Sequence, residues 1–192
     1  MNSFETSFDE AVIRAQEKWP NVPACFGWLK LDRRGNWLIK NAPITHPGAL
    51  KFINRNYAND AEGRWFIQNG PQRVYCELDY TPLIYRLEPA KTLTTHTGRR
   101  CEQITHILLD DEGNLLFETN LGLGQLDDRD LVNFCAAVDA ENQADWTEQA
   151  LDIDNNEHSL LNVHGNTYPF SVIAVADVPE RFGFVQTPTA SD

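Results

Sequence analysis

One ten-residue segment of this chain occurs twice in closely similar form. Leu31–Lys40 and Leu109–Glu118 share a leucine, an aspartate, a glycine, an asparagine and a second leucine at the same positions. In each copy an Asp-x-x-Gly sequence separates two apolar stretches, and glycine accepts the positive φ that closes such a turn. Each copy therefore predicts a β-hairpin. Two matching hairpins favour a fold that is itself duplicated, and they point to no reaction.

The segments around the hairpins support this interpretation. A capping-box pattern at Ser7 and Glu10 predicts an N-terminal helix that ends near Lys18. Each hairpin is then followed by an apolar helix, a glycine turn and a strand that closes near a proline. The strands expected besides the first hairpin are 64–68, 73–78, 83–87, 102–109, 114–119 and 170–176.

The sequence therefore predicts an α+β fold, with two tandem copies of a β-β-α-β-β-type motif and mainly antiparallel sheets after an N-terminal helix. Residues 139–159 are strongly acidic, have no counterpart in the first copy and are interpreted as an insert with a short helix over 146–151. The last residues are expected to fray. The expected organisation is an N-terminal helix over 1–22, a first repeat over 23–98, a second repeat over 99–185 and a tail over 186–192.

Composition excludes several kinds of partner. The chain carries 28 acidic and 16 basic residues, a net charge of -12, so a nucleic-acid backbone would be repelled. No stretch approaches the ~18 apolar residues of a membrane span, and the N-terminus does not resemble a signal peptide. Four cysteines without a Cys-x-x-Cys pair indicate free thiols rather than a zinc site or a disulfide framework. We expect a cytoplasmic protein with no metal, no cofactor, no nucleic acid and no membrane partner.

The densest polar stretch begins at residues 54–57, at the end of the helix expected after the first hairpin, and continues through residues 64–75. Guanidinium groups match carboxylates or phosphates, and amides give directional hydrogen bonds, so this stretch favours a small polar or anionic ligand. The alternative interpretation is a solvated turn. The candidate ligand-binding residues are Arg55, Gln68, Asn69, Gln72, Arg73 and His96.

Catalytic signatures are absent from the sequence. Gly122-Leu-Gly124 lacks the third glycine of a dinucleotide-binding loop, and the acids of 127–130 suit a helix N-terminus better than a cation site. His96 with Cys76, Cys101 or a carboxylate would be the base and nucleophile if the protein were an enzyme. The large aromatics of the predicted strands are expected in the core or in cross-strand pairs: Trp28, Trp37, Trp65, Tyr75 and Tyr80.

Three functions are consistent with these features. The first is a regulatory or ligand-binding protein that uses the polar stretch, and it is preferred because no catalytic signature is present. The second is a protein-interaction scaffold that uses the acidic insert 139–159. The third is the enzyme built on His96.

The hairpin 28–37, the Pro43-Ile44 step and the string Arg-Trp-Phe-Ile-Gln-Asn-Gly-Pro-Gln-Arg over 64–73 resemble a family of uncharacterised proteobacterial proteins, a domain of unknown function. The chain is more distantly similar to a family of two repeated α+β motifs, for which a role in signal transduction has been suggested. The resemblance covers about residues 5–137 and implies a bacterial protein with a duplicated fold. It assigns no catalytic residue. The distant family has a Pro-x-x-x-Val pattern where this chain has the amide-rich string.

Overall fold

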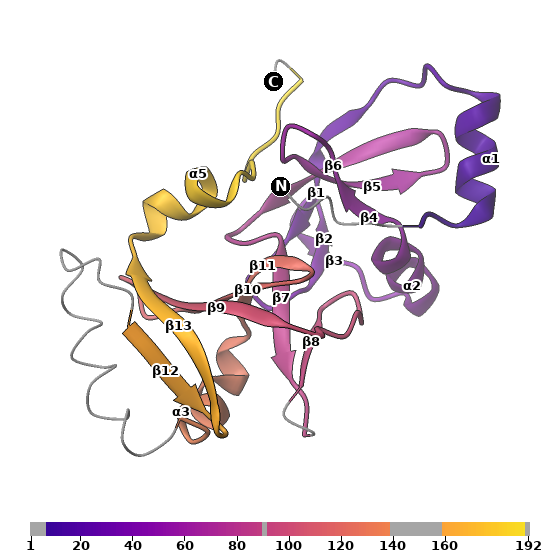
Figure 1. Ribbon diagram of the computed structural model, residues 1–192. Coiled ribbons are helices and arrows are strands. Elements are labelled where there is room, and N and C mark those ends of the chain that lie inside the picture. The colour runs from indigo at the N-terminus through magenta and orange to yellow at the C-terminus, as the bar shows by residue number, and fades with distance from the viewer. Residues whose placement is uncertain (1–6, 90–91, 139–158, 191–192) are drawn as a thin grey trace. The chain divides into compact units, whose positions relative to one another are not determined.

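In the computed structural model, residues 7–89, 92–138 and 159–190 are described (Figure 1). Those within Met1–Pro82, His96–Gly98 and Gly183–Asp192 form unit 1, and those within Leu83–Thr95 and Arg99–Phe182 form unit 2. Each unit is built on its own β-sheet. The chain is thus a mixed α+β protein with two sheets and an N-terminal helix, so the α+β part of the predicted fold class is confirmed.

Unit 1 contains a six-stranded sheet in the order β3-β2-β1-β6-β5-β4. The β1 strand pairs antiparallel with β2 and parallel with β6, so the sheet is mixed. Its elements are α1 Glu10–Lys18, β1 Cys25–Leu31, β2 Trp37–Ile39, β3 Ala42–Pro43, α2 Pro47–Arg55, β4 Tyr57–Asn59, β5 Trp65–Asn69 and β6 Gln72–Leu78. The predicted helices and the first hairpin are present.

The α2 helix is the apolar helix expected after the first hairpin. Pro47 occupies its first turn, where a missing N–H costs nothing. Nδ1 of His46 accepts a hydrogen bond from the backbone N–H of Ala49 at 3.2 Å and so caps the helix. The buried face of the helix contains Ile53, and Nε1 of Trp37 donates to Oδ1 of Asn54 at 2.8 Å. These contacts hold α2 against one face of the sheet.

Both faces of the unit 1 sheet are covered along β5, where four consecutive residues are buried. On one face Phe66 and Tyr75 meet edge to face at 5.7 Å, with Phe8 and Phe26 packed beside them. On the other face Tyr57 contacts the ring of Trp37 at 4.9 Å. Strands buried on both faces read as continuous apolar runs, as the first three residues of β5 do.

Unit 2 contains a seven-stranded sheet in the order β12-β13-β9-β10-β11-β7-β8. The β9 strand pairs antiparallel with β10 and parallel with β13. The elements of unit 2 are β7 Leu83–Leu87, β8 Leu93–Thr95, β9 Ile104–Asp110, β10 Leu115–Thr119, β11 Gly122–Leu126, η1 Asp128–Asp130, α3 Leu131–Cys135, β12 Ser159–Val163, β13 Asn166–Ile173, η2 Val175–Asp177 and α5 Val178–Phe182.

Several elements differ from the sequence-based expectation. The strand at 83–87, expected with the first hairpin, is β7 and pairs parallel with β11 in unit 2. The run at 170–176 ends as a strand at Ile173, because η2 begins at Val175. Residues 139–158, with the helix expected over 146–151, lie outside the described residues, and Ser159 begins β12. The strands that the sequence analysis missed are β3, β4, β8, β11 and β12.

The expected fraying of the tail is wrong at Gln186. Its backbone O accepts from the Leu78 N–H at 2.8 Å, and its Nε2 donates to the Tyr80 backbone O at 3.2 Å. The N–H of Val185 also donates to the Gly63 O at 3.0 Å. Hydrogen bonds to residues distant in the sequence therefore hold the start of the tail to the rest of unit 1, and no local sequence pattern predicts them.

Candidate functional site

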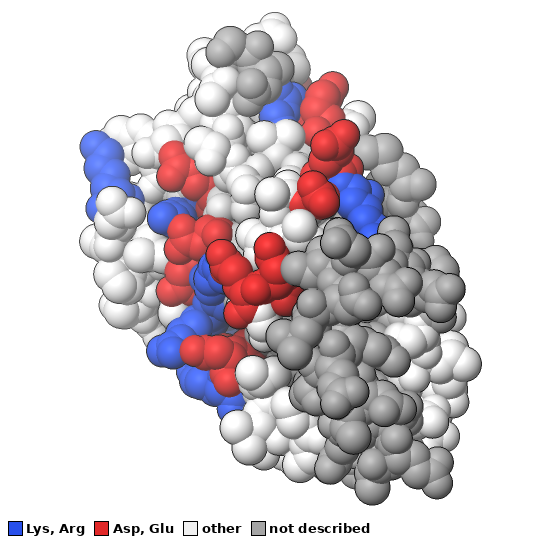
Figure 2. Space-filling view, turned by 90° about the vertical axis from the view of Figure 1, so that its left-hand side faces the viewer, with Lys and Arg blue, Asp and Glu red and all other residues white. Residues whose placement is uncertain are grey.

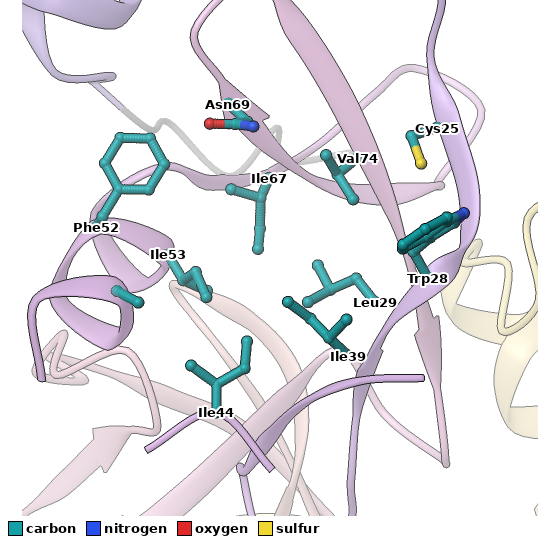
Figure 3. Close-up of a pocket in the computed structure, with 11 residues that line it drawn as sticks. Cys25, Trp28, Leu29, Ile39, Ile44, Phe52, Ile53, Ile67, Asn69 and Val74 are labelled. Atoms are coloured by element: carbon teal, nitrogen blue, oxygen red, sulfur yellow. The ribbon is translucent and has the colours of Figure 1, made fainter. Parts of the chain in front are cut away.

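An apolar hollow of about 340 Å³ opens on the α2-covered face of the unit 1 sheet. Figure 3 shows its side chains around a common space, with Phe52 and Ile53 on the helix and Ile67 and Val74 on the strands. The lining residues are Cys25, Trp28, Leu29, Ile39, Ile44, Ala49, Phe52, Ile53, Ile67, Asn69 and Val74. Such a cavity is at the lower end of the range for small-molecule sites, about 300–1,000 Å³.

A bulge in β1 shapes this hollow. Cys25 is paired with Val74 but Leu29 with Cys76, so β1 has extra residues there. Gly27 adopts φ +71 within the bulge, a conformation that favours glycine. Strict alternation would place Trp28 and Leu29 on opposite faces, yet both line the hollow. The bulge therefore directs Trp28 onto the rim, where it is 49% exposed.

The rim also carries a positive charge. Nζ of Lys40 lies 3.7 Å from the centroid of the Trp28 ring, and the Lys40 N–H donates to the Trp28 backbone O at 3.0 Å. Lys40 and Asn41 have φ 47 and 64, as expected for the tight two-residue turn between β2 and β3. The turn fixes the ammonium group of Lys40 beside Trp28, which lines the hollow, and this positive charge can attract a negatively charged group on a bound molecule.

The structure places the predicted ligand-binding residues of the β5–β6 hairpin in different surroundings. Asn69 is exposed and lines the hollow. Gln68 is 1% exposed, and its Nε2 donates to the Gly70 O at 2.9 Å. Nε2 of Gln72 donates to the Pro23 O at 3.0 Å, and the guanidinium of Arg73 covers the Phe66 ring at 4.5 Å. Of these four, Asn69 alone is part of the hollow.

Arg55 forms a two-point contact with a carboxylate. Its Nε and one terminal nitrogen each lie 2.9 Å from an Asp9 oxygen. Hydrogen bonds from Arg55 and then Asn56 lower the pKa of Asp9 below its ordinary value. This pair joins the end of α2 to the start of α1, so Arg55 is engaged in packing two helices.

His96 lies among aromatic rings of unit 1, with centroids 5.3 Å from Trp37 and 5.7 Å from Tyr57. Burial lowers its pKa to about 3, and the nearby charge of Asp32 opposes this only in part. Burial also raises the pKa of the Cys76 thiol well above its usual range. A weak base and a protonated thiol are poorly suited to nucleophilic catalysis near neutral pH.

All four cysteines are free thiols, as predicted. No group of three or more His, Cys, Asp or Glu side chains is arranged to hold a metal ion within the described parts of the chain. Within residues 7–89, 92–138 and 159–190, no helix has both the length and the apolar character needed to cross a membrane. On the face drawn in Figure 2, acidic and basic side chains are interleaved, as on a solvated surface.

The residues at the rim of the hollow were not among the predicted site residues. Trp28 was expected in the core or in a cross-strand pair, and Ile39 and Lys40 were assigned no role. In the structure Ile39 is 47% exposed. The available signal was Phe26-Gly27-Trp28, since an isolated glycine inside a strand pattern indicates a bulge. A bulge changes which side chains share a face.

The fold and the hollow define a two-unit α+β protein whose unit 1 contains a small apolar cavity. Residues 8–189 match DUF2944, described as "Protein of unknown function (DUF2946)", and the chain belongs to this family. The expected membership of a family of unknown function is thus confirmed. No curated protein matches.

Two solved structures are similar to this chain. One is a crystal structure of a DUF1285 family protein from Silicibacter pomeroyi DSS-3, with 14% identity and a TM-score of 0.52 over 87% of this chain and 97% of that one. The other is a DUF1285 family protein from Shewanella baltica OS155, with 14% identity and a TM-score of 0.45 over 60% and 95%. At this identity the first likeness shows a shared fold.

Proposed function

We propose that unit 1 binds a small amphiphile, with its apolar body in the hollow and an anionic group at the rim. The apolar cavity of about 340 Å³ carries this proposal. Asn69 supplies an amide at its wall, and Lys40 supplies the only charge that we assign to it, held against Trp28. Apolar walls with a few placed polar groups are the usual composition of a ligand site.

Octanoate is a suitable probe, because its chain is apolar and its head is a carboxylate. Burying a methylene is worth about 0.8 kcal/mol, so a short chain that is mostly buried offsets the cost of binding only modestly. We expect a Kd on the order of 0.1–1 mM. Because Trp28 forms part of the wall, its fluorescence should change saturably, and Trp28→Phe should remove that change.

The charge at the rim gives an order of affinities. Octanoate should bind more tightly than octanol, and octanol more tightly than octylamine, because an ammonium head would be repelled by Lys40. In the Lys40→Gln variant, the affinity for octanoate should fall close to the affinity for octanol. Equal affinities of the three probes in the wild type would contradict an anion-selective rim.

Two variants separate binding in the hollow from binding elsewhere. Val74→Tyr fills the cavity and should weaken octanoate binding at least tenfold. Val132→Tyr makes the same change at a site that is 78% exposed on α3 and should bind octanoate as the wild type does. Saturable binding to a folded Val74→Tyr protein with unchanged affinity would overturn the proposal.

We also propose that the two units are tandem copies, as the duplicated hairpins predict. The strand order β3-β2-β1-β6-β5 of unit 1 parallels β11-β10-β9-β13-β12 of unit 2. In each series the strands β1 and β9 have one antiparallel and one parallel neighbour, and a helix follows β3 and β11. The extra strands β7 and β8 extend only the second series.

A regulatory role fits this site better than a catalytic one. The low pKa of His96 disfavours it as a base, and the raised pKa values of Cys76 and Cys101 disfavour these thiols as its nucleophilic partners. The four free thiols favour a reducing cytoplasm, where we propose that the protein senses its ligand. Cell fractionation of the tagged protein would test that location, and recovery with exported proteins would contradict it.

A further inference from the structure

Unit 2 contains a second hollow, of about 200 Å³, between its sheet and α3. Phe134 and Ala137 line it from the helix side, and Ile107 and Phe117 line it from the central strands. The other lining residues are Leu87, Leu93, Ile104, Val163, His164, Asn166 and Tyr168. Like the hollow in unit 1, it is lined by a helical segment on one side and by strands of the sheet on the other.

Strand register relates the two hollows position by position. Leu29 is paired with Ile39 and Cys76, and Ile107 is paired with Phe117 and Phe170. Leu29, Ile39 and Val74 line the first hollow; Ile107, Phe117 and Tyr168 line the second. The last pair of the β5–β6 hairpin is Asn69 with Gln72, and Val74 follows Gln72 by two residues. The last pair of the β12–β13 hairpin is Val163 with Asn166, and Tyr168 follows Asn166 by two residues. Equivalent positions of the two sheets thus form both cavities.

The substitutions at these positions change the character of the cavity. Tyr168 replaces the smaller Val74, and Phe117 replaces Ile39, which agrees with the smaller volume. Val163 replaces the one amide, Asn69, while Asn166 and His164 add polar groups at the exposed hairpin turn. The second hollow is therefore smaller and more aromatic, and it is polar at its open end.

The walls of this hollow are fixed by local contacts. Phe117 and Phe134 meet edge to face with centroids 5.4 Å apart. The His164 N–H donates to the Ala137 O at 3.0 Å, so the end of the helix segment is tied to the β12–β13 turn. A cavity with anchored walls is preorganised, and less ordering is needed when a molecule enters it.

We propose that the unit 2 hollow binds a single aromatic ring that carries one polar group, the phenol class of ligand. A cavity of about 150 Å³ lined by Leu, Ile and Phe holds benzene, so about 200 Å³ admits one substituted ring. Phe117, Phe134 and Tyr168 offer ring contacts, and Asn166 offers a hydrogen bond to a hydroxyl at the open end. This site is separate from the one in the proposed function and is tested with its own probe and variants.

Titration of the full-length protein with p-cresol, followed by methyl NMR, tests the proposal. We expect saturable shifts at Leu93, Ile107 and Val163, which line the hollow. Ala137→Leu grows into the cavity and should abolish them, whereas Ala136→Leu at the adjacent exposed position should not. Val74→Tyr, which fills the other hollow, should leave these shifts intact.

The hydroxyl group of p-cresol allows a second test, which does not require a substitution that fills the cavity. Asn166→Ala, at an exposed position, should lower the affinity for p-cresol by about 2–10-fold, which corresponds to the loss of one hydrogen bond. Toluene, which has no hydroxyl, should bind this variant as it binds the wild type. The proposal is overturned if p-cresol shifts only unit 1 residues, if no shift saturates, or if a folded Ala137→Leu protein and Asn166→Ala both bind p-cresol unchanged.

Discussion

The ring centroid of His96 lies 5.3 Å from that of Trp37, in the interior of unit 1. Trp37 is 2% exposed, the neighbouring Tyr57 is 0% exposed, and Nε2 of His96 is buried. Burial disfavours the imidazolium form and lowers the pKa of His96 to about 3. The half-buried His96 therefore stays neutral beside these rings, and its protonation is coupled to unfolding.

Acid should destabilise the protein through His96. The pKa of His96 is about 3 in the folded protein and 6.5 in the unfolded chain. Its contribution to the free energy of unfolding is therefore complete above pH 6.5 and is lost as the pH falls towards 3. The free energy of unfolding should decrease by at most about 1.4 kcal/mol per pH unit in this window. Urea unfolding between about pH 7 and 4.5, above the titration of most carboxylates, measures this decrease. His96→Phe should flatten the profile, and an equal slope in both proteins would contradict the coupling.

The Asp-x-x-Gly turn of the duplicated hairpins occurs a third time, between β4 and β5. Asp32, Asp60 and Asp110 each accept backbone hydrogen bonds from residues two and four positions ahead. The glycine of each turn, at 35, 63 and 113, has φ between 77 and 84. The turn is thus a local solution for a tight hairpin, and it does not by itself identify a repeat.

The three turns differ in their side-chain partners, and Asp60 should be more sensitive to substitution than Asp32. The Asp60 carboxylate also accepts from Nε of Arg64 at 2.8 Å and from the Tyr75 hydroxyl at 2.9 Å. Burial alone would raise the pKa of Asp60, but the bonds from Arg64 and Tyr75 hold it below its ordinary value. Asp60→Ala should cost about 2–4 kcal/mol, because it leaves buried donors unsatisfied. Asp32→Ala, in the exposed turn, should cost about 1 kcal/mol, and equal losses in urea unfolding would contradict this reasoning.

Local sequence patterns predicted those parts of the fold that local energetics determine. Pro47, Gly35 and Gly113 act within their own turns, so α2 and both duplicated hairpins were predicted correctly. The pairing of β7 with β11 is a non-local choice, and the sequence analysis placed that strand with the wrong sheet. Short strands such as β3 and β8 owe their conformation to a neighbour, which leaves little periodicity to detect.

The candidate site was less predictable than the fold, because its residues were sought by polarity. The polar string 68–73 mostly serves the hairpin itself, as the Gln68 bond to the Gly70 O shows. The hollow depends instead on the bulge at Gly27, which directs Trp28 to the rim. Apolar residues are typical of cores, so nothing in their spacing separates a cavity wall from a packed interior.

Gly124 should be essential for joining β7 to its sheet. A Cβ at this position would lie 2.5 Å from the Leu83 O and 2.7 Å from the Tyr85 ring, so the parallel pair could not form without a shift. Gly124→Ala should therefore destabilise the protein by about 3 kcal/mol or more, as overpacking at backbone does. Gly98→Ala is the matched control, since a Cβ there meets nothing within 4 Å and only its φ of +85 is strained. Similar losses of stability for both variants would contradict a role in close strand approach.

Tyr168→Val should convert the unit 2 hollow towards the one in unit 1. Removing the phenol ring from the wall enlarges the cavity, and we expect octanoate to bind the variant at both hollows instead of one. The half-buried position limits the cost in stability to about 1–3 kcal/mol. Methyl NMR with octanoate should then show saturable shifts at Ile107 and Val163, besides those at Ile39 and Ile67. Thr167→Val, on the exposed adjacent residue, is the control and should add no second site. A stable Tyr168→Val protein that binds octanoate only in unit 1 would show that the size of this side chain does not set the selectivity of the two cavities.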